Sequence, residues 1–181
     1  MTNSLIPLEA PFPPDVATAL AQYPQQKGYI LTLFRTFALS LRFLKKCVPN
    51  LLDKESPLGL RMREITILRV TANRDCEYEW GVHVAVFSKA AGLTAEQVAS
   101  TRQSSAACWS PKEQRLIAAI DQLCVSSTLD DNRLAEFQAD WSNEEQLEIL
   151  ALCGTYSTIS LVANVARLSP EEFAPNFPPH C

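Results

Sequence analysis

The sequence predicts a single all-α domain, a compact bundle of several helices, and three observations support this fold class. Apolar residues recur at helical spacing, as in the set Phe34, Phe37, Leu41 and Leu44. Helix start signals, a Ser or Thr followed three residues later by Gln or Glu, recur along the chain. No alternating strand pattern, hairpin dipeptide or glycine-rich phosphate loop is present, and the sequence has only five glycines, so an α/β or all-β fold is not expected.

The elements follow one another with short breaks. We expect a short helix over residues 15–23, two helices within residues 28–52, and an amphipathic helix over residues 58–71. The next helix runs from about residue 76 to 91, where Gly92 ends it. The start signals Thr94 with Gln97, Ser110-Pro111 with Glu113, Asp130 or Asp131, and Ser142 with Glu145 open further helices, the last of them reaching about residue 168, and residues 169–172 form a final turn.

A chain of 181 residues is long enough for one domain with a real core. Residues 1–14 are proline-rich and predict an extended N-terminal arm. Residues 15–170 then form the single helical domain, and residues 171–181 form a proline-rich C-terminal tail.

Composition excludes several function classes. The net charge is −4 and no basic cluster occurs, so neither a nucleic-acid partner nor an anionic membrane surface is expected. The six cysteines are widely spaced and the N-terminus has no signal-peptide pattern, which favours reduced thiols in the cytoplasm. Residues 149–166 carry no charge but contain several polar residues, so we interpret them as a helix in the core or a subunit interface rather than a membrane span.

The densest group of reactive side chains lies in residues 75–83. Offsets of three and four residues place Cys76, Glu79 and His83 on one helical face, where they can share a cavity. Cys76 is near the start of its helix, whose dipole favours a thiolate, but neighbouring acids oppose this, so the direction of its pKa shift stays open.

Each of these residues also has a structural interpretation. Cys76 is equally consistent with a small buried hydrophobe, Tyr78 with packing, and His83 with a histidine satisfied in the core. No further histidine lies between residues 15 and 170, so we expect no metal site, and no motif indicates a cofactor.

The motif resembles the core of the carboxymuconolactone decarboxylase and alkyl hydroperoxidase D-like superfamily. In the peroxidase branch a glutamate is followed, after eleven residues, by a Cys-x-x-Cys pair and then by a histidine four residues later. Glu64, Cys76 and His83 match these positions, while Glu79 replaces the second cysteine. Flanking residues extend the resemblance over roughly residues 30–168.

The resemblance implies an alkyl hydroperoxidase D-like bundle and three candidate functions. In the first, a decarboxylase-like enzyme acts on a small organic acid or lactone, with His83 as acid or base and Glu64 and Glu79 orienting it or sharing its proton. Tyr78 and Tyr156 would line the substrate pocket. The second is a peroxiredoxin-type activity through Cys76, which lacks a resolving thiol because Glu79 takes that place. The third is a non-enzymatic binding or assembly protein.

The sequence also predicts a shared pocket and self-association. Cys76, Glu79 and His83 should line one partly enclosed pocket, with Glu64 entering from the preceding helix. The apolar stretches at residues 29–44 and 149–166 also predict self-association, a dimer as the first choice and a trimer or hexamer as alternatives.

Overall fold

The computed structural model describes residues 4–26, 28–102 and 107–178, and within them the all-α prediction is confirmed. The one addition is a short antiparallel hairpin, in which Gln25 pairs with Ile30 and Gln26 with Tyr29. The elements in chain order are α1 (Pro14–Leu20), β1 (Gln25–Gln26), β2 (Tyr29–Ile30), α2 (Thr32–Phe37), α3 (Leu41–Lys46), α4 (Leu60–Asn73), α5 (Glu77–Phe87), α6 (Ala95–Ser100), α7 (Pro111–Ser126), α8 (Asp131–Asp140) and α9 (Asn143–Ala166).

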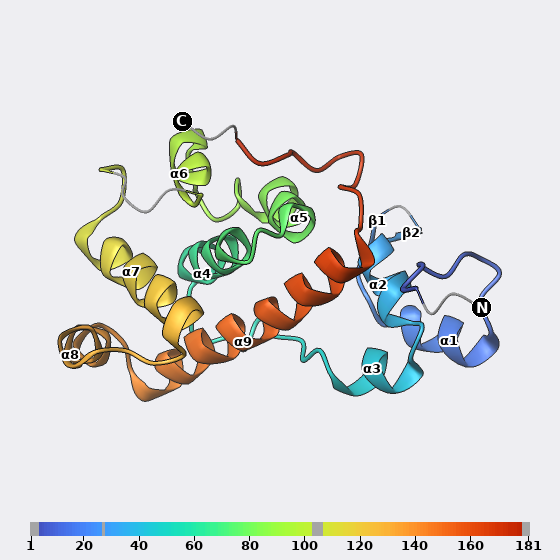
Figure 1. Cartoon of the computed structure of the whole chain (residues 1–181), viewed down its shortest axis with the longest axis horizontal. Helices are drawn as coiled ribbons and strands as arrows, with labels where there is room; N and C mark the ends of the chain where they lie inside the picture. Colours follow the sequence, from blue (N-terminus) through green and yellow to red (C-terminus); the bar gives the residue numbers. More distant parts are fainter. Residues whose placement is uncertain (1–3, 27, 103–106, 179–181) are drawn as a thin grey trace.

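Helix α4 is the centre of the fold, with α5, α7 and α9 packed around it (Figure 1). Every residue from position 63 to position 72 is buried, including Arg63, Glu64 and Arg69. The predicted amphipathic helix is therefore buried on all sides. Three charged side chains of this helix are shielded from solvent, so they need charged or polar partners inside the protein.

The predicted start signals position the later helices. Thr94 with Gln97, Ser110 with Glu113, and Ser142 with Glu145 all form complete capping boxes, and Asp130 accepts a hydrogen bond from the Arg133 N–H at the start of α8. Each cap satisfies backbone N–H groups that the first turn of a helix leaves without partners.

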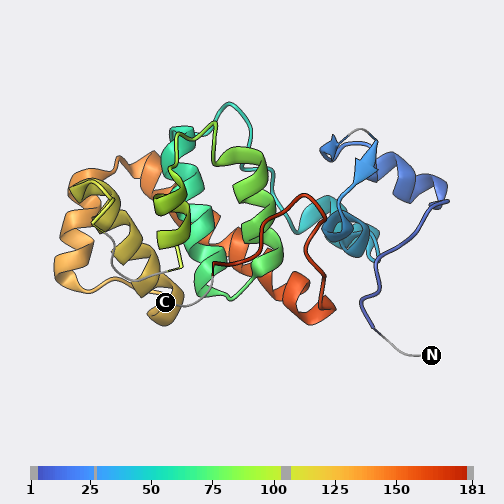
Figure 2. The ribbon, with the colours of Figure 1, turned by 90° about the horizontal axis from the view of Figure 1, so that it is seen from above.

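The N-terminal elements α1–α3 and the hairpin lie beside the C-terminal end of α9 (Figures 1 and 2). Aromatic rings hold this unit together: Tyr23 packs on Phe34 with ring centroids 4.6 Å apart, and Phe37 packs on Phe43 at 5.2 Å. The N-terminal arm contacts it through the Leu8 N–H, which donates to the Arg35 carbonyl.

After α9 the chain turns back and crosses α5 as a strap, residues 171–178 (Figure 2). No helix forms at residues 169–172; instead the Ala174 N–H donates to the Glu171 carbonyl in one tight turn. The strap passes so close to α5 that a Cβ on Gly81 would lie 2.5 Å from the Pro175 carbonyl oxygen. Only glycine fits at that crossing.

The far end of the strap is fixed by Phe177. Its N–H donates to Glu77 Oε1 at 2.8 Å, and its ring packs on Trp80 with centroids 5.2 Å apart. The Arg102 guanidinium lies 3.7 Å from the centre of the same ring. The strap is thus an integral part of the α5 surface.

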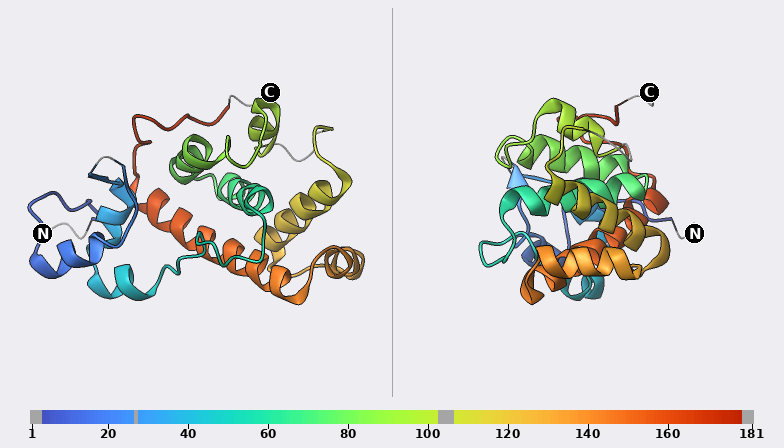
Figure 3. Two further views of the ribbon diagram at one scale, coloured as in Figure 1. Left: turned by 180° about the vertical axis from the view of Figure 1, so that it is seen from behind. Right: turned by 90° about the vertical axis from the view of Figure 1, so that its left-hand side faces the viewer.

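Helix α9 is the longest element and runs along one edge of the molecule (Figure 3). Among the described residues it is the one helix whose length and apolar composition would allow it to cross a membrane, and 39% of its most apolar 18-residue window is buried inside the protein. One such helix is weak evidence for a membrane protein, because core helices have the same composition.

Candidate active site

Three helices contribute the candidate site. Helix α4 provides Glu64, and α5 provides Glu79 and His83 from successive turns of one face. Cys76 is the residue on which α5 begins, after Asp75 reverses the chain with a left-handed backbone (φ 49°). The four predicted catalytic residues therefore come from α4, from α5 and from the residue that precedes α5, and the third helix, α9, adds Tyr156 and Ser160.

His83 is held between two carboxylates. Its Nδ1 lies 2.8 Å from Glu64 Oε2, a hydrogen bond, and its Nε2 lies 3.5 Å from Glu79 Oε1, which is longer than a good hydrogen bond. The imidazole is only 2% exposed, Glu64 is fully buried, and Glu79 is 5% exposed. Glu64 thus fixes the ring, while Nε2 is left for a second partner.

The two carboxylates determine the charge of the imidazole. Burial alone would lower the pKa of His83, but the charge and hydrogen bonding of Glu64, with those of Glu79, raise that pKa to about 9. His83 is therefore an imidazolium at neutral pH. Nδ1 then donates to Glu64, and Nε2 carries a proton next to Glu79.

The Arg63 guanidinium lies beside the Glu64 carboxyl group. Its Nε lies 3.7 Å from Glu64 Oε1. Acidic and basic side chains are thus buried together, which reduces the free-energy cost of removing them from water.

Several polar atoms of the site lack a hydrogen-bond partner although they are buried. They belong to both carboxylates, to the guanidinium and to a serine of α9: Glu64 Oε1, Glu79 Oε2, Arg63 Nε and Ser160 Oγ. Buried polar groups are nearly always hydrogen-bonded. The Ser160 hydroxyl interacts with the Cys76 thiol, so the other three atoms, which surround His83, indicate a place for a polar ligand.

Cys76 is fully buried beside this group. Burial raises the pKa of its thiol to about 11, although the Glu79 backbone N–H and the Ser160 hydroxyl act in the opposite direction. The Glu79 and Asp75 carboxylates raise that pKa further. The direction that the sequence left open is therefore upward, toward the neutral thiol.

Among the described residues, Cys76 forms no disulfide with another cysteine. In the part of the chain that the structure describes, the five cysteines are free. Cys153 interacts electrostatically with Cys124, and its pKa is raised to about 12, mainly by burial. Cys124 belongs to α7 and Cys153 to α9.

Tyr156, predicted from the resemblance, contacts the site. Its ring meets the His83 ring edge-on with centroids 5.0 Å apart. Burial, then Glu79 and Glu64, raise the pKa of its phenol, so the hydroxyl stays neutral beside the two acids.

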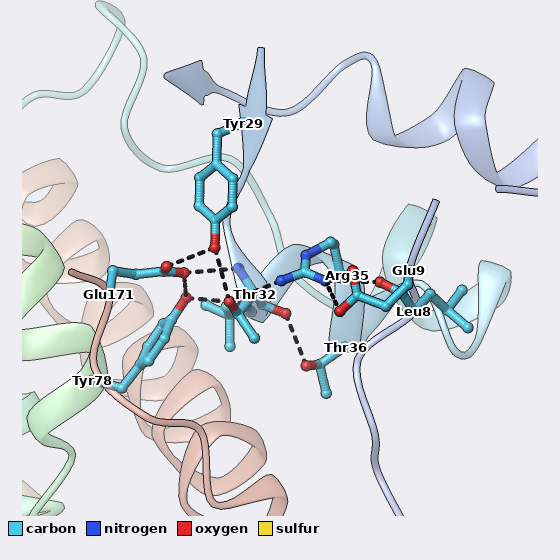
Figure 4. A network of polar contacts seen from close by, with 9 residues as sticks. Leu8, Glu9, Tyr29, Thr32, Arg35, Thr36, Tyr78 and Glu171 are labelled. Atoms are coloured by element: carbon cyan, nitrogen blue, oxygen red, sulfur yellow. Dashed lines mark hydrogen bonds and ion pairs between the residues drawn. The ribbon is translucent and has the colours of Figure 1, made fainter. Parts of the chain in front are cut away.

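Tyr78 has a different environment. Its hydroxyl donates to Glu171 Oε1 and accepts from the Leu33 N–H at 3.1 Å, while the same carboxylate accepts from the Thr32 N–H and the Tyr29 hydroxyl (Figure 4). These contacts join α5, α2 and the strap. The Tyr78 hydroxyl is engaged both as a donor and as an acceptor, so only its ring is available to contact a ligand.

A cavity of about 370 Å³ adjoins the start of α5. It lies between this helix start and the C-terminal end of α9, and its lining is largely polar: Asp75, Glu77, Tyr78, Ala163, Asn164, Arg167, Leu168 and Pro170. Of the residues predicted for the site, Tyr78 lines this cavity, whereas Glu64, Cys76, Glu79 and His83 are not among its lining residues. Over the described ranges no group of three or more His, Cys, Asp or Glu side chains is arranged to hold a metal ion.

Two residues of the site were missing from the sequence prediction. Arg63 directly precedes Glu64 in the motif, and a charged residue inside an apolar helix was a signal for it. Ser160 follows Tyr156 by four residues in α9, which places both on one helical face. That spacing could have identified it.

Comparison with known proteins agrees with the motif. Residues 40–122 match the model of the carboxymuconolactone decarboxylase family, and this segment contains Glu64, Cys76, Glu79 and His83. None of the curated proteins searched matches the chain.

A solved structure supports the fold over nearly the whole chain. It is that of an uncharacterized peroxidase-related protein from Silicibacter sp. TM1040, with a TM-score of 0.77 and 15% identity, and the match covers 95% of this chain and 96% of the other. At that identity the similarity establishes the fold and not the activity. In its motif and over residues 40–122 the chain is thus similar to the carboxymuconolactone decarboxylase family, and it has the fold of the peroxidase-related protein.

Proposed function

We propose that the protein is a decarboxylase-like enzyme that moves protons on a small organic acid or lactone in the cytoplasm. The observation that carries this proposal is the position of the buried His83 imidazole between the carboxyl groups of Glu64 and Glu79. A histidine with a pKa of about 9 is protonated at neutral pH and acts as a general acid.

Each side chain has a separate task in this proposal. Glu64 holds Nδ1 and keeps the ring in place. Nε2 delivers its proton to the substrate carbon when a carbon–carboxylate bond breaks, releases CO2 and leaves the electron pair on that carbon. Glu79, whose Oε2 has no hydrogen-bond partner, accepts a proton in an isomerisation or returns one from solvent to Nε2.

The thiol peroxidase alternative is less well supported. A peroxidatic cysteine reacts as the thiolate, whereas burial raises the pKa of Cys76 to about 11. Glu79 stands where the motif would place the resolving thiol. Burial of the thiol and the lack of a cysteine at position 79 therefore both disfavour thiol chemistry at Cys76.

The test follows hydrogen exchange rather than a particular product. A panel of small unsaturated acids and lactone acids is incubated with the protein in D2O, and NMR records deuterium at the carbon next to the carboxyl group. Glu79→Gln and His83→Gln should slow the reaction roughly 10²–10⁴-fold. Cys76→Ser should keep most of it, because the thiol moves no proton.

Hydroperoxide consumption with dithiothreitol is measured on the same variants. If Cys76→Ser abolishes turnover of hydroperoxide while His83→Gln stays active on every acid tested, the acid/base proposal is wrong and a thiol enzyme replaces it. Circular dichroism of each variant separates loss of chemistry from loss of fold.

A further inference from the structure

A second hydrophobic cluster lies between α4, α5 and α6, apart from the main core. Leu68, Ala72 and Trp80 form its buried centre. Four side chains that are only partly buried pack against this centre: Val84, Leu93, Val98 and Phe177. Apolar side chains that lie together and stay partly open provide a surface for an apolar ligand.

The open side of this cluster forms a cavity of about 490 Å³. Trp80 and Val84 line it from α5. Val98 and Ala99 line it from α6, and Asn176 lines it from the strap (Figure 1). Cavities of this size with a mainly apolar lining are typical of sites for small molecules. We call it the α5–α6 cavity.

Hydrogen bonds and a ring contact hold the walls of this cavity. The Trp80 indole N–H donates to Thr101 Oγ1 at 2.8 Å, which joins α5 to the residue that ends α6. The Thr101 carbonyl accepts from Arg69 Nη1 at 2.7 Å, and the Phe177 ring holds the strap against Trp80. Walls that are already ordered reduce the entropy that a ligand would lose the protein on binding.

The polar groups of the lining determine which ligand fits. The Trp80 indole N–H is engaged as described, and the Ser88 hydroxyl donates to the Val84 carbonyl at 2.6 Å, so neither donor is available. Of the described residues that line the cavity, Lys89 is the only charged one. Its side chain is exposed, which places the ammonium at the opening, and it makes no ion pair with a described residue.

We propose that the α5–α6 cavity binds an apolar monocarboxylate. Its hydrocarbon part lies against Trp80 and Val84, and its carboxylate lies at the Lys89 ammonium. Asn176, also exposed at the opening, donates a second hydrogen bond through its side-chain amide. One negative charge matches the one ammonium, while the apolar remainder of the lining offers no partner to a second charged group.

This cavity is separate from the candidate active site, although both use α5. Trp80 and Val84 are four residues apart and share one face of the helix. Glu79 and His83, each one position earlier, share the neighbouring face. None of the four predicted catalytic residues lines the cavity. Binding there involves no step of the proposed reaction and is measured without turnover.

Isothermal titration calorimetry of the full chain tests the ligand class with simple probes. Octanoate should bind at one saturable site, more tightly than octan-1-ol and much more tightly than octylammonium. From hexanoate to octanoate to decanoate, each added methylene should lower the dissociation constant about fourfold, because it is buried against apolar side chains.

Two substitutions test the location, each with a matched control. Lys89→Glu should weaken octanoate binding about five- to tenfold and leave octan-1-ol binding unchanged. Lys45→Glu, at an exposed lysine of α3, should bind octanoate as the wild type does. Ala99→Phe should weaken both ligands at least about tenfold, because the ring occupies part of the cavity, whereas Ala135→Phe on the exposed side of α8 should have no effect.

The absence of saturable octanoate and decanoate binding at millimolar concentration would overturn the proposal. Equal octanoate binding by Lys89→Glu and Lys45→Glu, or tighter binding of octylammonium, would overturn it as well. So would a dissociation constant that stays the same from hexanoate to decanoate. Circular dichroism checks the fold of Ala99→Phe, and Lys89→Glu, a surface substitution, keeps the test decisive if that variant does not fold.

Discussion

The buried imidazolium makes the stability of this protein depend on pH in a range where most side chains do not titrate. The pKa of His83 is about 9 in the folded chain and 6.5 in an unfolded one. Because the folded pKa is the higher, the stabilisation is complete below pH 6.5 and is lost as the pH rises toward about 9.

The size of the effect follows from that difference. One pKa unit corresponds to about 1.4 kcal/mol, so protonated His83 contributes on the order of 3 kcal/mol at low pH. Between pH 6.5 and about pH 8.5 the free energy of unfolding should fall by about 2 kcal/mol. This window lies below the ordinary thiol pKa of 9.0, so the buried cysteines add little to the change.

Urea titrations at a series of pH values measure the change directly. Glu64→Gln removes the charge nearest to Nδ1 and should flatten the pH dependence by at least half. Cys76→Ser should leave the slope intact and serves as the control. A wild-type slope near zero over this window would refute the assignment of a protonated His83 between two carboxylates.

Two further predictions concern the strap and are measured as shifts in the free energy of unfolding. Gly81→Ala should destabilise the protein by about 1–3 kcal/mol, because the new Cβ would meet the Pro175 carbonyl oxygen at 2.5 Å; unchanged stability would mean that the strap can lift from α5. Tyr78→Phe should cost about 1–3 kcal/mol, since it leaves buried Glu171 with one donor fewer and the Leu33 N–H without its acceptor, and a loss below about 0.5 kcal/mol would contradict this network.

The sequence predicted the helices best where a local signal marks their ends. The capping pairs at Thr94, Ser110 and Ser142 act within four residues of chain, so their effect can be read without tertiary structure. The hairpin at residues 25–30 has two residues in each strand, too few for an alternating pattern to be recognised.

The sequence predicted those parts of the site that depend on helical spacing and on the family motif. The geometry of His83 with Glu79 follows from their separation of four residues. The buried surroundings that raise the pKa of Cys76 were not predictable, because they depend on how α9 packs against α5. The contact between Tyr78 and Glu171 joins residues 93 positions apart, and no local pattern carries that information.

The Glu171 carboxylate has a consequence for the order in which the chain folds. It supplies the acceptor for the Thr32 N–H at the start of α2, and 139 positions separate the two residues. A six-residue helix is too short to be stable by itself. During synthesis, the Thr32 N–H can therefore bind this acceptor only after almost the entire chain has been made. The N-terminal unit is made first, yet the start of α2 is completed by a residue that is made near the end of synthesis.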